Sequence, residues 1–104
     1  MATTRRYREK MNAALYCLAV REGDVRQRLR GAYRYLRMLS PVEVPVEHRE
    51  EFTAILRACT RHGPELGLDN EVWRSSLEHT MQRIRNSTGR AIAERIYRLA
   101  RHLD

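Results

Sequence analysis

Residues 4–40 read TRRYREKMNAALYCLAVREGDVRQRLRGAYRYLRMLS and contain two helical patterns joined by one glycine–aspartate pair. In the first pattern, apolar residues recur at spacings of three and four, as on one face of a helix. Gly23 is the residue type favoured just past a helix end, and Asp24 is a good cap for a following helix. The pattern predicts a first helix over residues 4–22, whose apolar face contains Tyr7, Met11, Ala14, Leu15 and Leu18.

A second helix is predicted from Asp24 to about Ser40-Pro41. Residues 40–43, Ser-Pro-Val-Glu, have the spacing of a capping box with proline at the first helical position. Pro45 would fall inside a helix that began there, so we expect one helical turn and then a break. The apolar face of the second helix is expected to contain Val25, Leu29, Ala32, Tyr33, Leu36 and Leu39.

The third predicted helix covers residues 46–62 and ends at Gly63-Pro64. A short loop then leads to Asp69, a residue type that caps helices, and a fourth helix is expected from there. Residues 86–89, Asn-Ser-Thr-Gly, favour caps and turns, yet the apolar spacing continues through them to Leu103. Either one long helix crosses a weak point or two helices meet at a kink, and we favour the bent or interrupted helix. The fourth helix would carry Val72, Trp73, Leu77, Met81 and Ile84.

Taken together, these patterns predict an all-α, compact bundle of four to five helices, with the last helix long and kinked near Asn86-Gly89. No alternating run of β-branched residues indicates a strand. At 104 residues and 42% hydrophobic composition, the chain is long enough and apolar enough for a single all-α domain over residues 1–104.

The sequence contains no segment that predicts export or a membrane span. The longest apolar run, from Ala13 to Val20, is too short to cross a bilayer. Basic residues precede it as in a secretory signal, but Glu9 and Asn12 interrupt the pattern and no small-residue cleavage site follows. We therefore expect a cytoplasmic protein without membrane contact, in which Cys17 and Cys59 are small buried hydrophobic residues.

The net charge of +7 is unevenly distributed. Residues 1–22 carry a net +3 and residues 23–40 a net +4, whereas residues 41–68 carry −2 and residues 69–104 carry +2. Four arginines of the second helix are spaced four, four and three residues apart, so they line one face. We call this set the arginine stripe: Arg26, Arg30, Arg34 and Arg37.

Like charges at this spacing repel one another, so the arginine stripe needs a neutralising partner. One alternative is internal, a set of salt bridges to the third helix through Glu43, Glu47, Glu50 and Glu51. A second alternative is the phosphate backbone of RNA or DNA, which guanidinium groups bind in a bidentate manner. A third is the acidic surface of another protein. The sequence leaves all three open.

Further candidate contact residues lie near the stripe in the chain: Arg5, Arg6, Arg8 and Tyr35. Tyrosines among arginines can stack on exposed bases. Tyr7, Tyr33 and Tyr97 share the apolar faces of their helices and are expected in the core, as is Trp73. Tyr35 lies off the apolar face and is the better contact candidate.

Catalytic and metal-binding patterns are weak. The sequence contains neither a glycine-rich phosphate loop nor a nucleophile elbow. Cys59 and His62 are three residues apart, but a zinc site needs two further ligands and no Cys-x-x-Cys pair supplies them. We predict no catalytic residue, no metal, no cofactor and no small-molecule substrate, with His48 and His79 on the surface.

One enzymatic spacing needs comment. Small helical ribonucleases of the HEPN class place an arginine before a histidine with four to six residues between them. This spacing occurs here three times, which is no more than chance gives in a chain so rich in arginine, and we attach no function to it. The pairs are Arg57–His62, Arg74–His79 and Arg95–His102.

The leading hypothesis is a non-catalytic helical binding or regulatory module that contacts nucleic acid or a nucleoprotein through its first two helices. Arginines bind the phosphate backbone without contacting base edges, so we expect little sequence specificity and an affinity that depends strongly on salt. The alternative is a protein–protein adaptor or a small subunit of a larger complex, with a homodimer among its forms and no direct nucleic-acid contact.

Overall fold

Helices α1 (Arg5–Val20) and α2 (Val25–Leu36) form the pair that residues 4–40 predict. In the computed structural model, which describes residues 4–102, the Thr4 side chain caps α1 by accepting a hydrogen bond from the Tyr7 N–H at 3.2 Å. Asp24 caps α2 by accepting one from the Gln27 N–H at 3.1 Å. Gly23 turns the chain between them with φ of 97°, a left-handed conformation that costs glycine no steric strain.

The single turn and the break predicted after α2 are both present. Residues Pro41–Glu43 form a 3₁₀ turn, η1, and the Glu43 carboxylate accepts a hydrogen bond from the Ser40 N–H at 2.9 Å. Helix α3 (Val46–Cys59) begins directly after Pro45. It ends three residues before the predicted His62, and the chain turns at Gly63, where φ is 67°.

The prediction of a helix from Asp69 is wrong for residues 69–75, because the helix there begins at Ser76. The prediction that the chain has no strand is also wrong. Residues 65–74 form a β-hairpin, in which β1 (Glu65–Leu66) pairs antiparallel with β2 (Val72–Arg74) around η2 (Leu68–Asn70). Asp69 and Asn70 both have φ of 61°. Two consecutive left-handed residues make the tight turn that matches strand twist, and Asp and Asn tolerate it better than most residues.

Helices α4 (Ser76–Arg83) and α5 (Asn86–Ala100) replace the long last helix. The predicted interruption is confirmed, but it lies at Ile84 and Arg85, whose backbones are extended. The predicted weak point, residues 86–89, forms the first turn of α5. Gly89 lets α5 approach α2 closely, because a Cβ atom there would lie 3.0 Å from Cγ1 of Val25. Leu103 lies outside the described residues.

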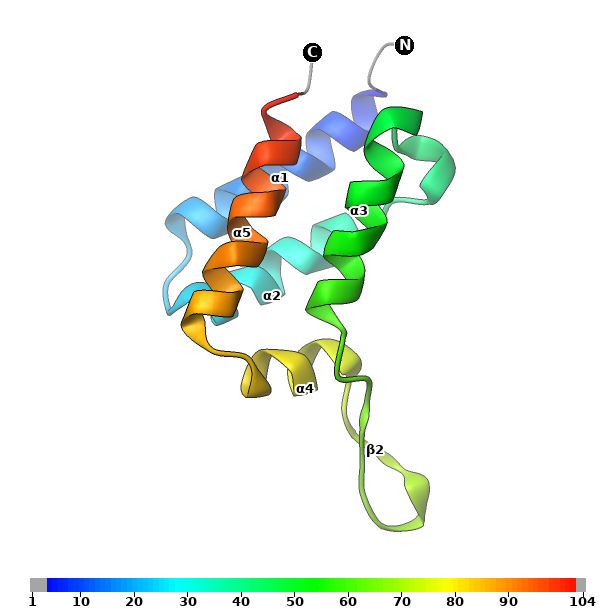
Figure 1. Cartoon of the computed structure of the whole chain (residues 1–104), viewed down its shortest axis with the longest axis vertical. Coiled ribbons are helices and arrows are strands. Elements are labelled where there is room, and N and C mark those ends of the chain that lie inside the picture. The colour runs from blue at the N-terminus through cyan, green and yellow to red at the C-terminus, as the bar shows by residue number, and fades with distance from the viewer. Residues whose placement is uncertain (1–3, 103–104) are drawn as a thin grey trace.

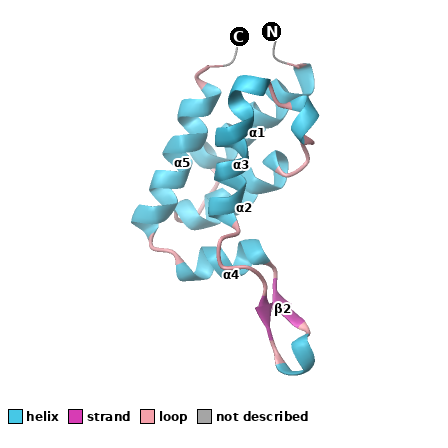
Figure 2. Ribbon diagram, turned by 45° about the vertical axis from the view of Figure 1, so that its right-hand side comes forward, coloured by secondary structure: helices cyan, strands magenta, loops and turns pink. Residues whose placement is uncertain are grey.

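The helices form two layers that α4 closes at one end. Helices α3 and α5 lie over α1 and α2, and α4 runs across the lower end of the bundle (Figure 1). The β-hairpin projects beyond α4, away from both layers (Figure 2). It lengthens the molecule to 48 Å, against 27 and 17 Å along the other two axes. Within residues 4–102, no helix is both long enough and apolar enough to span a bilayer.

The core lies between the two layers and is built from residues of every α-helix. Tyr7 of α1 is fully buried, packs edge-on against Phe52 with ring centroids 6.3 Å apart, and shares a 3.0 Å hydrogen bond with Nδ1 of His48. Burial raises the pKa of Tyr7 to about 12, so the hydroxyl stays protonated. The surface position predicted for His48 is wrong: the side chain is buried, where it satisfies this hydroxyl. Cys17 and Cys59 are buried free thiols, as predicted.

Two aromatic residues predicted in the core are on the surface. Trp73 is 64% exposed because it belongs to the hairpin, and Tyr97 is 53% exposed on the outer side of α5. Tyr33 is half-buried at the edge of the core. The rings of Trp73 and Tyr97 therefore form apolar surface that the rest of the bundle leaves exposed.

A salt bridge between α3 and α5 gives the fold a defined acid sensitivity. Arg95 donates to both carboxylate oxygens of Glu51, at 2.7 and 2.9 Å. This hydrogen bonding lowers the pKa of Glu51 below its ordinary value of 4.5, against a smaller opposing effect of desolvation. A lowered carboxyl pKa stabilises the fold above the ordinary pKa, and this contribution disappears as the pH falls through the folded-state value.

We therefore expect Glu51→Gln to lose less stability than the wild type when the pH is lowered from about 6 to about 3. The measurement is urea unfolding across this range. Glu50→Gln is the matched control, since the Glu50 carboxylate makes no ion pair among residues 4–102. Equal acid sensitivity of wild type and Glu51→Gln would contradict the assignment.

Candidate phosphate-binding site

The arginine stripe is divided into a paired half and an open half. Arg26 donates to the Asp24 carboxylate at 3.0 Å and to the Ile84 carbonyl at 3.2 Å. Arg30 lies within 2.9 and 3.0 Å of the two carboxylate oxygens of Glu78, which belongs to α4. The N-terminal half of the stripe is thus neutralised inside the molecule.

None of the four glutamates expected to cover the stripe pairs with it within residues 4–102, so that part of the internal alternative is wrong. Glu43 pairs with Arg6 of α1 at 2.7 Å, and Glu51 pairs with Arg95 of α5. Glu47 and Glu50 are exposed. The pairing follows the packing of α3 against α5, which carries Glu51 away from the outer face of α2.

Arg34 and Arg37 form the open half of the stripe. Both are exposed, and neither makes an ion pair with any residue between 4 and 102. They lie at the C-terminal end of α2, where the partial negative charge of the helix end stabilises cations. Both guanidinium groups therefore lie at one end of α2 without a carboxylate of residues 4–102 to neutralise them.

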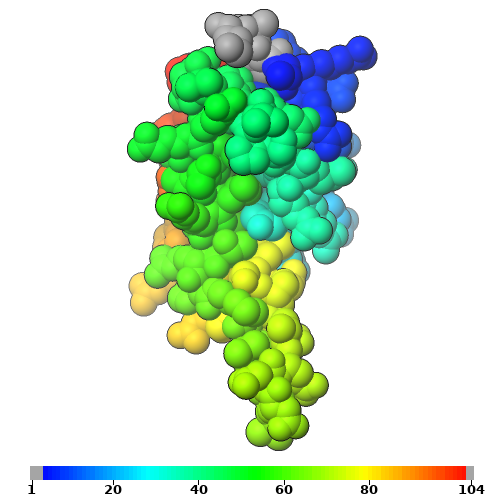
Figure 3. All heavy atoms as spheres, turned by 90° about the vertical axis from the view of Figure 1, so that its right-hand side faces the viewer, coloured from blue at the N-terminus to red at the C-terminus, as the bar shows by residue number. Residues whose placement is uncertain are grey.

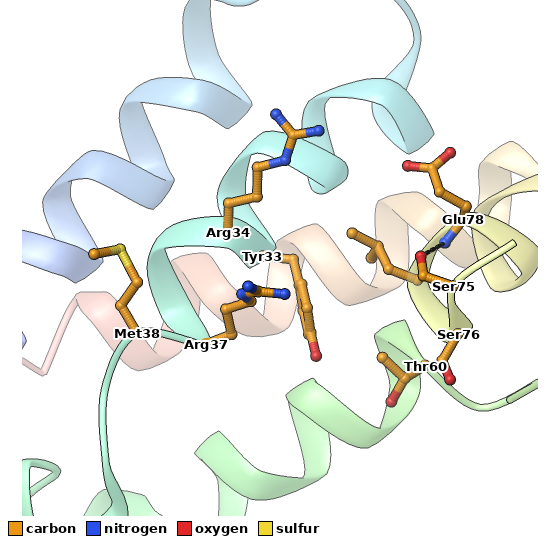
Figure 4. A pocket seen from close by; sticks show the side chains of 9 residues that line it. Tyr33, Arg34, Arg37, Met38, Thr60, Ser75, Ser76 and Glu78 are labelled. Carbon is orange, nitrogen blue, oxygen red and sulfur yellow. Dashed lines mark hydrogen bonds between the residues drawn. The ribbon is translucent and has the colours of Figure 1, made fainter. Parts of the chain in front are cut away.

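A cavity of about 690 Å³ opens beside these two arginines, where α2, the end of α3 and the start of α4 meet (Figure 4). Arg37 extends toward the Tyr33 ring, and Arg34 extends away from it. Thr60, Ser75 and Ser76 come from the other two elements. We call this the α2–α4 cavity. It is lined by Tyr33, Arg34, Arg37, Met38, Thr60, Ser75, Ser76, Leu77 and Glu78.

Two hydroxyl donors in this cavity, those of Ser75 and Tyr33, are available to an anion. The Ser75 oxygen accepts a hydrogen bond from the Glu78 N–H at 3.2 Å, which leaves its own hydrogen free. Burial, with a smaller effect of nearby Cys59, raises the pKa of Tyr33 although Arg37 opposes the shift, so this hydroxyl stays protonated and can donate. Thr60 instead donates to the Leu56 carbonyl at 2.9 Å. Glu78 is the single carboxylate on the wall, and Arg30 neutralises it.

The remaining predicted contact residues are only partly near this site. Arg6 donates to the Met38 carbonyl at 3.1 Å, next to Arg37, but it is already paired with Glu43. Arg5 pairs with Glu9 of its own helix, and Arg8 is exposed; neither lines the α2–α4 cavity.

Tyr35, 37% exposed, lies beside a residue that sequence reasoning missed. The ammonium group of Lys10 is 5.7 Å from the centroid of the Tyr35 ring, within the range of a cation–π interaction. Nothing in the linear sequence indicates this contact, because it depends on how α1 packs against α2.

One of the three arginine–histidine pairs, Arg74–His79, lies at the base of the β-hairpin, where the His79 ring is 5.9 Å from the ring of His62. Arg74 pairs with Glu65, and the Nδ1 atom of His79 lies 3.0 Å from the Gly63 carbonyl, so both side chains hold the base of the hairpin. Burial raises the pKa of Cys59 to about 12, which keeps its thiol neutral. Within the same residues, no three His, Cys, Asp or Glu side chains gather as a metal site would require.

No protein-family model, curated protein or solved structure matches this chain. The fold and the site define a small helical bundle with an arginine-edged, hydroxyl-lined cavity, and its chemistry is the basis for a functional proposal.

Proposed function

We propose that the protein is a cytoplasmic, non-catalytic module that binds the phosphate backbone of RNA or DNA through Arg34 and Arg37. The observation that carries this proposal is the pair of exposed arginines, unpaired with any carboxylate of residues 4–102, on the edge of a cavity that the hydroxyl groups of Tyr33 and Ser75 also line. The buried free thiols of Cys17 and Cys59 suit a reducing compartment.

The chemistry of the cavity favours a phosphate group over a protein carboxylate. A guanidinium fork can donate two parallel hydrogen bonds to phosphate, and further phosphate oxygens accept from hydroxyl groups. With Glu78 neutralised by Arg30, the two open arginines leave a net charge of about +2 on the cavity edge. Ser76 begins α4, so the first N–H groups of that helix lie on the same wall.

The neighbouring surface suits an extended strand. The Tyr35 ring of α2 and the Lys10 ammonium group of α1 lie 5.7 Å apart, where they can contact a base and the following phosphate. These groups would contact the phosphate backbone and the faces of the bases, and they would make no hydrogen bonds to base edges. We therefore expect little discrimination between sequences.

Electrophoretic mobility shift with RNA, single-stranded DNA and duplex DNA, each at about 50 and 200 mM salt, tests the proposal. We expect a shift at the lower salt that weakens strongly at the higher one, because binding releases counterions from the phosphate backbone. The three nucleic acids distinguish single-strand from duplex preference. Absence of a shift with all three at low salt would refute the proposal.

A second candidate function is a protein–protein adaptor, and the exposed apolar residues of the β-hairpin favour it. Leu68 and Trp73 are 82% and 64% exposed on an element that contacts α4 through β2. Apolar side chains gathered on a projecting element are typical of interaction sites. This function does not exclude the first, because the α2–α4 cavity and the hairpin present separate surfaces.

A further inference from the structure

The β-hairpin of residues 65–74 is an apolar arm that the bundle does not cover. It extends as a narrow projection from the end of the molecule (Figure 3). A two-stranded hairpin is only marginally stable by itself, and exposed apolar side chains add no stability in water. These side chains contribute a favourable free energy when another apolar surface covers them and removes them from water. The exposed apolar residues are Leu66, Leu68, Val72 and Trp73.

The indole ring of Trp73 is held in place against the backbone of the hairpin. A Cβ atom on Gly67 would lie 2.1 Å from Nε1 of Trp73, so the ring lies directly on the Gly67 backbone. The φ angle of Gly67 is −96°, which other residues adopt freely, so glycine is needed here for space. An ion pair between Glu65 and Arg74 joins the two strands beside it. Trp73 is thus pre-organised, which lowers the entropy cost of docking.

A matching apolar groove lies between α1 and α5. Its volume is about 500 Å³, which is ample for an indole ring together with a leucine side chain. Tyr97, which the core does not use, forms one wall. We call it the α1–α5 groove; its apolar lining consists of Leu15, Leu18, Ala19, Ala93 and Tyr97.

The hairpin and the groove carry opposite charges. Residues 65–74 contain three acidic residues and one arginine, a net −2 in a chain whose net charge is +7. Arg90 and Glu94 are both on the wall of the α1–α5 groove, and Arg98 pairs with Glu94. Arg101 lies 5.8 Å from the Tyr97 ring, which gives three arginines against one glutamate. The groove edge is therefore net positive. Two copies packed groove to groove would repel, whereas hairpin and groove attract.

We propose that the hairpin of one copy docks into the α1–α5 groove of a second copy, with Trp73 as the central anchor. The inference rests on the second candidate function and names its partner as this chain itself. The contact is head-to-tail, because it joins two different surfaces, so it generates a ring or an open chain. It leaves Arg34 and Arg37 free.

The single tryptophan makes docking visible in the wild-type protein. As concentration rises, we expect sedimentation velocity to show self-association and Trp73 emission to move to shorter wavelength, because the ring leaves water. The two changes should share one concentration dependence. A wild-type protein that remains monomeric at millimolar concentration, with unchanged emission, would overturn the inference.

Two variants separate the hairpin from the groove. Trp73→Ala removes the anchor, and Ala19→Glu places a bulky negative group in the groove at an exposed helix position. Each is expected to weaken self-association at least tenfold. Ala91→Glu is the matched control, since Ala91 is also exposed on a helix and lies outside the groove lining.

Mixing the two variants gives the sharpest test, because each retains the surface that the other lacks. We expect a 1:1 heterodimer that grows no further, with blue-shifted emission from the tryptophan of Ala19→Glu. Self-association of Trp73→Ala alone at wild-type strength would overturn the inference in favour of groove-to-groove packing. If circular dichroism shows that Trp73→Ala is misfolded, Leu68→Ser at the exposed tip replaces it.

The result is independent of nucleic-acid binding. A monomeric wild type that still shifts RNA or DNA overturns the docking inference alone. Self-association without a mobility shift refutes the phosphate proposal alone.

Discussion

Replacing Arg34 and Arg37 together by glutamine is expected to lower the affinity for nucleic acid by about a hundredfold or more, since each charge-assisted hydrogen bond is worth about 1.5–3 kcal/mol and about 1.4 kcal/mol corresponds to tenfold. The salt dependence should change as well. With a single-stranded ligand, the slope of log affinity against log salt should fall by about 1.4, which is about 0.7 for each phosphate that the variant no longer neutralises. Filter binding or fluorescence anisotropy over a salt series measures both quantities.

The matched control removes two arginines elsewhere on the surface. Arg83→Gln with Arg85→Gln removes the same amount of charge at the far end of α4, where both side chains are exposed. We expect this control to reduce affinity less than the Arg34 and Arg37 pair does. Equal effects of the two double variants would mean that net charge alone attracts the ligand, and the α2–α4 cavity would then have no special role.

Tyr7→Ala is expected to have the largest effect on stability, a decrease of about 3–5 kcal/mol in the free energy of unfolding. Small domains have about 5–15 kcal/mol in total, so this variant is close to the limit of folding. Tyr7 is fully buried, packs edge-on against Phe52, and joins α1 to α3 through its hydrogen bond to His48. Urea unfolding monitored by circular dichroism measures the decrease.

Tyr7→Phe separates the ring from the hydroxyl. This variant keeps the aromatic packing and leaves Nδ1 of His48 buried without its partner, which should cost about 1–3 kcal/mol. If Tyr7→Ala were no more destabilising than Tyr7→Phe, the packing role given to the ring would be wrong.

The first three helices could be predicted because local signals and packing agree there. Gly23 adopts a positive φ that the absence of a side chain permits, Asp24 caps α2, and Pro45 precedes α3 where proline permits a helix to begin. The apolar spacing of α1 also places Tyr7 correctly in the core. Each of these features depends on residues within a few positions of one another.

The same local sequence signals could not distinguish the hairpin from a helix. Val72 and Trp73 continue the spacing of Leu77 and Met81, so the apolar pattern fits a helix as well as a strand end. Asp69 is a good residue for a helix cap and also for a left-handed turn. The signal that distinguishes a hairpin turn from a helix cap is the pair Asp69-Asn70, which comes two residues after Gly67 and suits a tight hairpin turn.

The candidate site depends on long-range geometry that a pattern along one helix does not contain. Spacing predicts that the four arginines line one side of a helix. In the structure, three of them belong to α2 and Arg37 is the residue that caps its C-terminal end. Which of them are open depends on Glu78, which is 48 residues from Arg30 in the chain and reaches it only through the packing of α4 on α2. The cavity likewise needs three elements to meet.

The Arg30–Glu78 ion pair also sets how far the open basic face of the first two helices extends. Residues 1–40 carry ten basic and three acidic side chains. Because Glu78 of α4 neutralises Arg30, Arg34 and Arg37 are the members of the arginine stripe that make no ion pair within residues 4–102. The packing of α4 on α2 therefore confines the open part of the stripe to one end of α2.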